Sequence, residues 1–216
     1  MKKLLYIIAN SKSEELSTSR TVSRQLVNAI KEKVPDVQLE ELNLYEDHIP
    51  QLKGCYFASR SAIVSAEARG QLSTEEQGEI AHIEQLCDQF KAADIYVLGA
   101  PMWSLSFPAP VKEYLDCIIQ AGKTISFDED NKPHGLMGDK HRVFIYVQSS
   151  GANIPWPLKG VLSKGTSYVD DIMKFIGIEG FDELLVDDTG TTEEDRQSAI
   201  IKAVAKIPEL VEKWFS

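Results

Sequence analysis

Runs of hydrophobic residues alternate with segments of helical periodicity along most of the chain. Residues 4–9, 95–100 and 143–147 are apolar throughout, which is typical of strands covered on both faces of a sheet. Residues 37–42 are partly polar and residues 184–186 form only a short apolar run. These two segments are expected to be edge strands, so the pattern predicts five strands in all.

Between these runs, apolar positions recur every three or four residues, as on one face of an α-helix. Two segments, Ser73–Glu76 and Thr191–Glu194, have the Ser/Thr-x-x-Glu spacing of a capping box, which marks a helix start. Pro110 suits the first turn of another helix. Pro208 is expected to kink the helix that contains it. Helices are predicted over residues 19–33, behind Ser73, from Pro110, over about 158–176 and behind Thr191.

Strands that alternate with helices predict an α/β fold with a parallel sheet covered on both faces. With the first, third and fourth strands apolar and the second and fifth less so, the expected order is 2-1-3-4-5. Residues 43–72 are irregular, and residues 122–140 are expected to form a loop or hairpin. Neither a repeat nor a linker is evident, so residues 1–216 are interpreted as a single domain.

Composition and charge disfavour several classes of function. The chain has 33 Asp and Glu against 23 Lys and Arg, a net charge of −10. This disfavours binding to nucleic acid or to an anionic membrane, since both need clustered cations. Cys55, Cys87 and Cys117 have no metal-ligand spacing, and reduced thiols suit a cytoplasmic protein. The first apolar run is too short for a signal peptide or a membrane span.

In a sheet of this order, ligands bind where the strand order reverses, beyond the carboxyl ends of strands 1 and 3. The loop after strand 1, residues 10–20, is rich in hydroxyl side chains and opens a helix. Hydroxyl groups and free N–H groups at a helix N-terminus can bind a phosphate. Helix capping by Ser17 or Ser19 would explain the same residues without any ligand.

The other two loops at this edge add different chemistry. Residues 101–108 carry Met102, Trp103, Leu105 and Phe107, which suit the wall of a site for a flat ring. Residues 148–152 are small and polar, so their backbone can approach a ligand closely. Each loop can also be explained without a ligand: residues 101–108 as a cluster packed under the next helix, and residues 148–152 as a connection between a strand and a helix. Together they predict a site for a heteroaromatic ring with one phosphate tail.

These segments carry a family resemblance that extends over nearly the whole chain. The chain resembles the FMN-dependent NADH azoreductases and the related NAD(P)H quinone reductases, which have a flavodoxin-like three-layer fold. The motifs that carry the resemblance are Ser11 with Ser17-Thr18-Ser19, Ala100-Pro101-Met102-Trp103, Lys112–Asp116, Ala121-Gly122-Lys123-Thr124 and Gly135–Lys140.

The resemblance implies an enzyme that takes hydride from NADH or NADPH and passes two electrons to quinones or azo compounds through FMN. It also implies a homodimer with the active site at the interface, and no catalytic side chain or metal, since the flavin carries the chemistry. By this resemblance, Ser11, Ser17, Thr18 and Ser19 hold the FMN phosphate. The flavin ring is contacted by Pro101, Met102, Trp103, Ser104 and Leu105 on one side and by Gln148, Ser149, Ser150 and Gly151 at its polar edge. The substrate pocket includes Ile125 and Phe127.

The sequence departs from the family at two places near the ring. Ser104-Leu105 replaces the usual Asn-Phe, and Ser150-Gly151 replaces Gly-Gly. A flavodoxin-type one-electron carrier is the alternative, although the first loop lacks the Thr-x-Thr-Gly-x-Thr pattern of such carriers. A receiver domain would need acidic residues after strand 1 and an Asp after strand 3, where Asn10 and Pro101 stand. A hydrolase is disfavoured because no Gly-x-Ser-x-Gly motif occurs.

Overall fold

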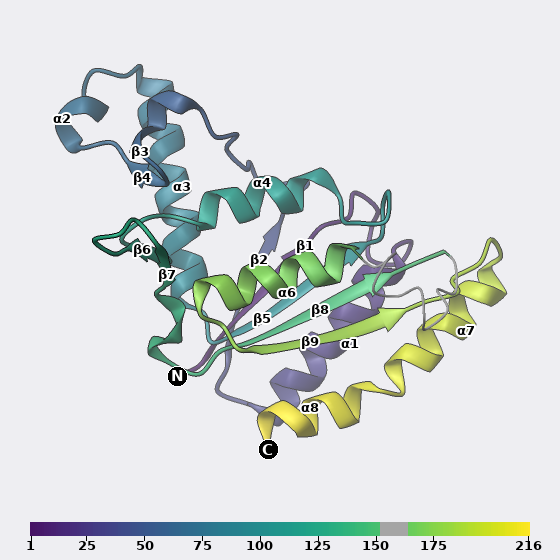
Figure 1. Cartoon of the computed structure of the whole chain (residues 1–216). Coiled ribbons are helices and arrows are strands. Elements are labelled where there is room, and N and C mark those ends of the chain that lie inside the picture. Colours follow the sequence, from purple (N-terminus) through teal and green to yellow (C-terminus); the bar gives the residue numbers. More distant parts are fainter. Residues whose placement is uncertain (152–163) are drawn as a thin grey trace.

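The computed structural model describes residues 1–151 and 164–216, and its centre is a parallel sheet of five strands. The predicted five-stranded parallel sheet is therefore confirmed (Figure 1). The order along the sheet is β2-β1-β5-β8-β9, so the direction of winding reverses between β1 and β5. The strands are β1 (Lys3–Ile8), β2 (Gln38–Asn43), β5 (Ile95–Pro101), β8 (Val143–Ser149) and β9 (Gly180–Val186).

Helices cover both faces of this sheet because alternate strand residues point to opposite sides. Leu4, Tyr6 and Ile8 face one helical layer, whereas Leu5 and Ile7 face the other. Figure 1 shows α1, α7 and α8 on one side of the sheet and α4 and α6 on the other. The long helices are α1 (Thr18–Lys33), α3 (Thr74–Ala92), α4 (Ala109–Ile118), α6 (Lys164–Ile176), α7 (Glu193–Val204) and α8 (Ile207–Phe215).

Most helix starts follow the sequence signals. Ser73 caps α3 in a complete capping box with Glu76, and Pro110 lies in the first turn of α4, as predicted. The start of α7 was predicted one residue too early, because Thr192 rather than Thr191 is the N-cap and Asp195 closes the box. Asp can replace Glu there because its carboxylate reaches the Thr192 N–H at 3.3 Å. The expected kink at Pro208 is instead a break between α7 and α8, with the proline in the first turn of α8.

The two irregular stretches contain small elements. Residues 43–72 include the 3-10 helix η1 (Gly54–Tyr56), the hairpin of β3 (Phe57–Ser59) and β4 (Ala62–Ile63), and the short helix α2 (Ala66–Arg69). The expected excursion at residues 122–140 is a hairpin of β6 (Ile125–Phe127) and β7 (Pro133–Gly135), followed by η2 (Met137–Asp139). Of the helix predicted over about 158–176, residues 158–163 lie outside the described residues.

Candidate functional site

A cleft opens at the carboxyl ends of β1, β5 and β8, at the point where the strand order reverses. Its volume is about 220 Å³. All three loops predicted to form a ligand site contribute to it, together with the loop after β9. The lining residues are Asn10, Lys12, Leu16, Ser17, Thr18, Pro101, Met102, Trp103, Ser149, Ser150, Gly151 and Thr189.

The structure brings together most, but not all, of the residues expected to bind FMN. Ser17, Thr18, Pro101, Met102, Trp103, Ser149, Ser150 and Gly151 line the cleft. Ser11 is exposed beside it, whereas Ser19 is fully buried behind Ser17. Ser104 and Leu105 are exposed on a turn next to Trp103. Gln148 is 1 % exposed and does not line the cleft.

The N-terminus of α1 forms one end of the cleft. The Ser17 hydroxyl accepts a hydrogen bond from the Arg20 N–H at 3.2 Å, so Ser17 is the N-cap. The capping interpretation is therefore correct, and it does not exclude ligand binding because the same residue lines the cleft. The remaining N–H groups of the first turn have no partner within the helix and, with the positive end of the helix dipole, favour an anion.

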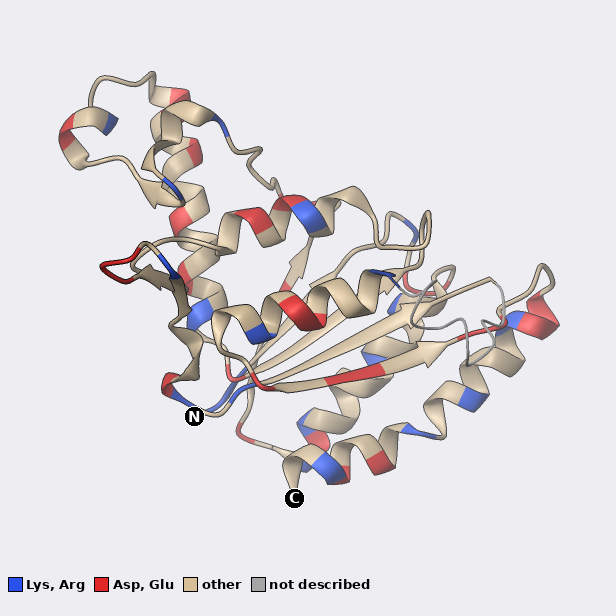
Figure 2. Ribbon diagram, in the orientation of Figure 1, with Lys and Arg blue, Asp and Glu red and all other residues tan. Residues whose placement is uncertain are grey.

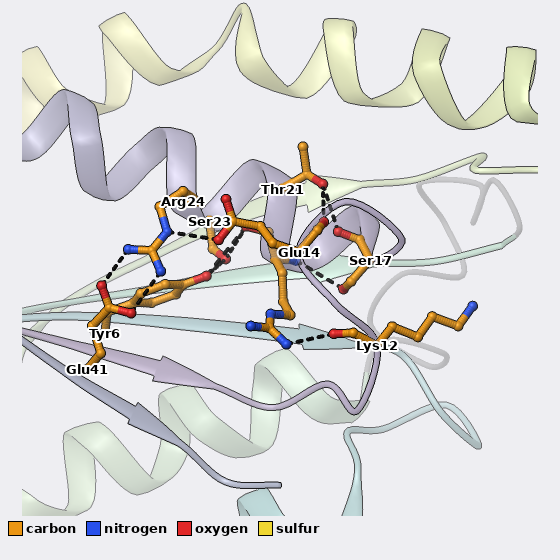
Figure 3. A network of polar contacts seen from close by, with 9 residues as sticks. Tyr6, Lys12, Glu14, Ser17, Thr21, Ser23, Arg24 and Glu41 are labelled. Atoms are coloured by element: carbon orange, nitrogen blue, oxygen red, sulfur yellow. Dashed lines mark hydrogen bonds and ion pairs between the residues drawn. The ribbon is translucent and has the colours of Figure 1, made fainter. Parts of the chain in front are cut away.

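Polar contacts from α1 fix the loop that precedes it, as Figure 3 shows. The Thr21 hydroxyl donates to the carbonyl oxygen of Glu14 at 2.8 Å. Arg20 donates to the carbonyl oxygen of Lys12 at 2.6 Å. The Arg24 guanidinium donates to the Glu14 carboxylate at 3.0 Å. The loop is thus held at several points before any ligand arrives.

Arg24 also joins this loop to the end of the neighbouring strand β2. Its two terminal nitrogens donate to the Glu41 carboxylate at 2.6 and 2.8 Å. These hydrogen bonds hold the pKa of Glu41 below its usual value and raise the pKa of Arg24. Beneath Arg24, the Tyr6 hydroxyl lies 2.7 Å from the Ser23 hydroxyl, and burial raises the pKa of Tyr6 to about 12. Tyr6 is therefore a neutral structural group at physiological pH.

The second loop makes a tight turn that projects apolar side chains. Trp103 and Ser106 exchange both backbone hydrogen bonds, at 3.1 and 2.9 Å. The residues between them, Ser104 and Leu105, have φ of 51° and 63°, a left-handed conformation that Leu rarely adopts. Trp103 is 49 % exposed, and its ring meets the Tyr45 ring edge-on at 6.5 Å. The turn thus holds an aromatic wall at the cleft.

The third loop is fixed by β9 and α6. The Ser150 N–H donates to the Val186 carbonyl at 3.0 Å, and Thr189 donates to the Ser150 carbonyl through both its N–H and its hydroxyl. Gln148 lies beneath this loop, and a Cβ atom at Gly165 would approach its Oε1 to 3.1 Å. Gly165 therefore allows α6 to pack closely on the end of β8.

The residues expected in the substrate pocket lie on the β6–β7 hairpin and do not line the cleft. Ile125 is 2 % exposed and belongs to the core of the chain. The Phe127 ring is half-buried beneath the Arg60 guanidinium at 5.8 Å. The backbone of β7 at Gly135 packs against the end of α6 at Ile176. Within one chain, the hairpin is thus at the opposite end of α6 from the cleft (Figure 1).

Sequence reasoning missed Asn10, Lys12, Leu16 and Thr189, all of which line the cleft. Asn10 could have been found as the polar residue that ends the first apolar run. Four larger hollows, of about 300 to 580 Å³, are lined by described residues outside the three predicted loops. Ion pairs such as Lys140–Asp94, Lys3–Glu40 and Lys213–Asp182 involve several of their charged side chains. Across the described ranges, no cluster of three or more His, Cys, Asp or Glu side chains could hold a metal.

Positive and negative side chains are mixed over the described surface (Figure 2), which suits a small ligand better than nucleic acid. Figure 2 shows Lys and Arg scattered over several helices and loops, interspersed with Asp and Glu. Among the described residues that line the cleft, Lys12 is the one with a charged side chain. None of the helices in residues 1–151 and 164–216 is both long and apolar enough to span a membrane.

Comparisons with known proteins identify the family. Residues 2–211 match the family model described as "Flavodoxin-like fold". The chain is 62 % identical over 213 residues to an FMN-dependent NADH:quinone oxidoreductase of Ruminiclostridium cellulolyticum, covering 99 % of this chain and 100 % of the relative. It is 54 % identical over 212 residues to a protein of the same name from Clostridium botulinum strain Eklund 17B, covering 98 % and 99 %.

A solved structure shows the same fold. It is an FMN-dependent NADH-azoreductase from Bacillus anthracis in complex with FMN, with 24 % identity, a TM-score of 0.85 and complete coverage of both chains. At 24 % identity this structure shows only that the fold is shared. The two relatives at 62 % and 54 % identity show the family. The chain belongs to the flavodoxin-like family and, within it, to the group of the FMN-dependent NADH:quinone oxidoreductases.

Proposed function

We propose that this protein is an FMN-dependent oxidoreductase that takes hydride from NADH and passes two electrons to a quinone or an azo compound. One observation carries the proposal: an anion-binding helix N-terminus and an aromatic wall meet in one cleft at the reversal point of the sheet. The names of the relatives supply the substrate classes, NADH and quinone, and that of the structural neighbour adds azo compounds.

The residues of the cleft fit FMN both in their chemistry and in their arrangement on the loops after β1, β5 and β8. Ser17 and Thr18 offer hydrogen-bond donors at the start of α1, as a phosphate requires. Met102 and Trp103 offer flat apolar contact for an isoalloxazine ring. Ser149, Ser150 and Gly151 supply polar backbone along the third side. When bound, FMN supplies the hydride-accepting and electron-donating chemistry, and the chain binds and orients it.

We further propose that the protein is a cytoplasmic, single-domain homodimer with its active site at the interface. Cys55, Cys87 and Cys117 are free thiols, which supports a reducing compartment. Leu16, Trp103 and Leu105 expose 67, 49 and 47 % of their surface around the cleft, which supports coverage by a second copy. In such a dimer, Phe127 is the proposed substrate contact. Size-exclusion chromatography with light scattering would test this assembly, and a monomer would refute it.

The test of the activity is anaerobic addition of NADH to FMN-reconstituted protein while the flavin absorbance is followed. Complete bleaching without a stable one-electron reduced form, followed by recovery on adding a quinone, is the expected result. Persistence of a one-electron form would favour the flavodoxin-type carrier. Bound FMN that neither NADH nor NADPH bleaches would refute the oxidoreductase.

A further inference from the structure

Asn10, the residue that follows β1, has a side-chain amide whose orientation is fixed by the backbone. Its Oδ1 accepts a hydrogen bond from the Lys12 N–H at 2.9 Å. An amide NH₂ group cannot accept from an N–H, so the oxygen must lie on that side. The Nδ2 group therefore faces α1, where it lies 2.7 Å from the Ser17 hydroxyl and 3.4 Å from the Ser19 hydroxyl. Asn10 is 6 % exposed, so water does not compete for these contacts.

This arrangement decides which way the Ser17 proton points. A serine hydroxyl has two acceptor lone pairs and one proton. In Ser17, the Asn10 Nδ2 group and the Arg20 N–H donate to the oxygen. The proton is then left to donate, either into the cleft or to the Ser19 hydroxyl at 3.3 Å. Ser17 thus presents a donor, and no free acceptor, to a ligand.

A ligand group that only accepts hydrogen bonds fits such a donor. A phosphate monoester dianion is of this kind, whereas the terminal hydroxyl of an unphosphorylated flavin also brings a proton that needs an acceptor. Ser17 lines the cleft with only the 6 % exposed edge of Asn10 beside it, and Ser19 is fully buried behind them. The cradle formed by Asn10, Ser17 and Ser19 therefore distinguishes FMN from riboflavin through the direction of a proton as well as through charge.

We propose that Asn10 is a positioning residue that orients the Ser17 hydroxyl as a donor and so makes the cleft selective for the phosphorylated flavin. The inference rests on the proposed function, because it assumes that FMN binds in this cleft. It assigns to Asn10 a role that acts through Ser17, without contact between Asn10 and the reacting atoms.

The variant Asn10→Asp tests the direction of the proton while keeping the shape of the loop. Its carboxylate can still accept from the Lys12 N–H, so the turn after β1 is retained. On the other side it can only accept, so Ser17 and Ser19 must donate to it, and its charge opposes a phosphate dianion. We expect the Kd for FMN to rise by at least about 100-fold, as for loss of an oriented hydrogen bond to a charged group. The Kd for riboflavin should change less than about threefold, since riboflavin brings no charge and can donate.

Asn43→Asp is the matched control. Asn43 ends the neighbouring strand β2, and its Oδ1 accepts from the Tyr45 N–H at 3.1 Å, the same two-residue spacing as in Asn10. The variant adds the same charge at the same edge of the sheet without contacting Ser17. Its FMN-to-riboflavin affinity ratio should equal that of the parent protein.

Fluorescence titrations of FMN and riboflavin into all the proteins, with circular dichroism as a check on folding, give the decisive ratios. A ratio that falls in Asn10→Asp but not in Asn43→Asp supports the inference. An unchanged ratio in a folded Asn10→Asp protein overturns it. If Asn10→Asp does not fold, Asn10→Ala decides by the same criterion, with an expected loss of about tenfold for FMN alone. A parent protein that binds no FMN overturns the proposed function itself, and the inference with it.

Discussion

Gly99 lies where α1 crosses β5, and replacing it with Ala should destabilise the protein. A Cβ atom at this position would approach the Ser23 Oγ to 2.4 Å and the Ser23 Cβ to 3.0 Å. Ser23 is fully buried, and its hydroxyl is tied to the Tyr6 hydroxyl at 2.7 Å and to the Arg20 carbonyl at 3.1 Å. The side chain therefore cannot turn away without losing these contacts, so α1 must shift or the hydrogen bonds must break.

The magnitude follows from three contributions. Overpacking of a buried contact costs about 2 kcal/mol. Loss of the hydrogen bond between Tyr6 and Ser23 adds about 1 kcal/mol. Ala has a lower conformational entropy than Gly in the unfolded chain, and this offsets the loss of stability by about 0.7 kcal/mol. Gly99→Ala should therefore lower the free energy of unfolding by about 2 kcal/mol.

Urea denaturation of a double-mutant cycle measures this effect and its cause. Ser23→Ala alone should cost about 1 kcal/mol, because the Tyr6 hydroxyl loses its short hydrogen bond to Ser23 and keeps only the Arg20 carbonyl, at 3.4 Å. In that background Gly99→Ala should cost about 1 kcal/mol rather than about 2, because the closest contact no longer exists. Gly78→Ala is the control: nothing lies within 4 Å of its added Cβ on α3, so it should stabilise the protein by about 0.5–1 kcal/mol. A neutral Gly99→Ala, or strictly additive effects in the cycle, would refute the steric argument.

Three further predictions concern the turn and aromatic wall at the cleft and the ion pair between Arg24 and Glu41 of β2. Leu105→Asn should raise the free energy of unfolding by about 0.5–1 kcal/mol in urea denaturation, because Asn tolerates φ near the 63° of this position better than Leu does; a loss of stability would contradict the assigned turn. Trp103→Ala should weaken FMN binding about tenfold in fluorescence titrations, since it removes the half-exposed ring, while Trp103→Phe should keep most of the affinity; equal loss in both would contradict a stacking role. Glu41→Gln should lower stability near pH 7 by about 0.5 kcal/mol, a value reduced for solvent exposure. Arg24 holds the folded-state pKa of Glu41 below its usual value, so this contribution is present above about pH 4.3 and disappears as the pH falls through the folded-state pKa; denaturation curves of both proteins across this range should converge at the acid end.

The fold could be predicted from the sequence wherever one physical requirement decides the pattern. Strands β1, β5 and β8 are buried on both faces, so they had to be continuously apolar. Strand β9 is longer than the predicted residues 184–186, because it is an edge strand whose first half mixes apolar and acidic residues. Asp182, within that half, accepts hydrogen bonds from Lys213 and Trp214 of α8 at 2.6 and 2.9 Å. Such a long-range partner leaves no local signal.

The sequence predicts which loops form the site, but not which of their side chains line the cleft. The reversal of strand order identified the loops, because that rule depends on topology alone. It could not separate Ser17, which lines the cleft, from Ser19, which lies behind it. The left-handed conformation of Ser104 and Leu105 also has no sequence signal, since neither residue favours it. The sequence places Asn10 at the start of the hydroxyl-rich loop and against a receiver domain, but it carries no signal that the Asn10 amide orients Ser17.

The packing of α1 also bears on how the protein is made. Helix α1 carries the cradle, yet Val22, Leu26 and Ile30 of this helix share a core with residues of α7 and α8. The ion pair between Lys33 and Glu212, at 2.8 Å, joins positions 179 residues apart, and Arg196 reaches back 181 residues to the Glu15 carbonyl. During synthesis on a ribosome, α1 therefore emerges long before the helices that cover it. A growing chain that still lacks α7 and α8 leaves this face of the sheet open to water and to other chains, so α1 completes its packing only late in translation.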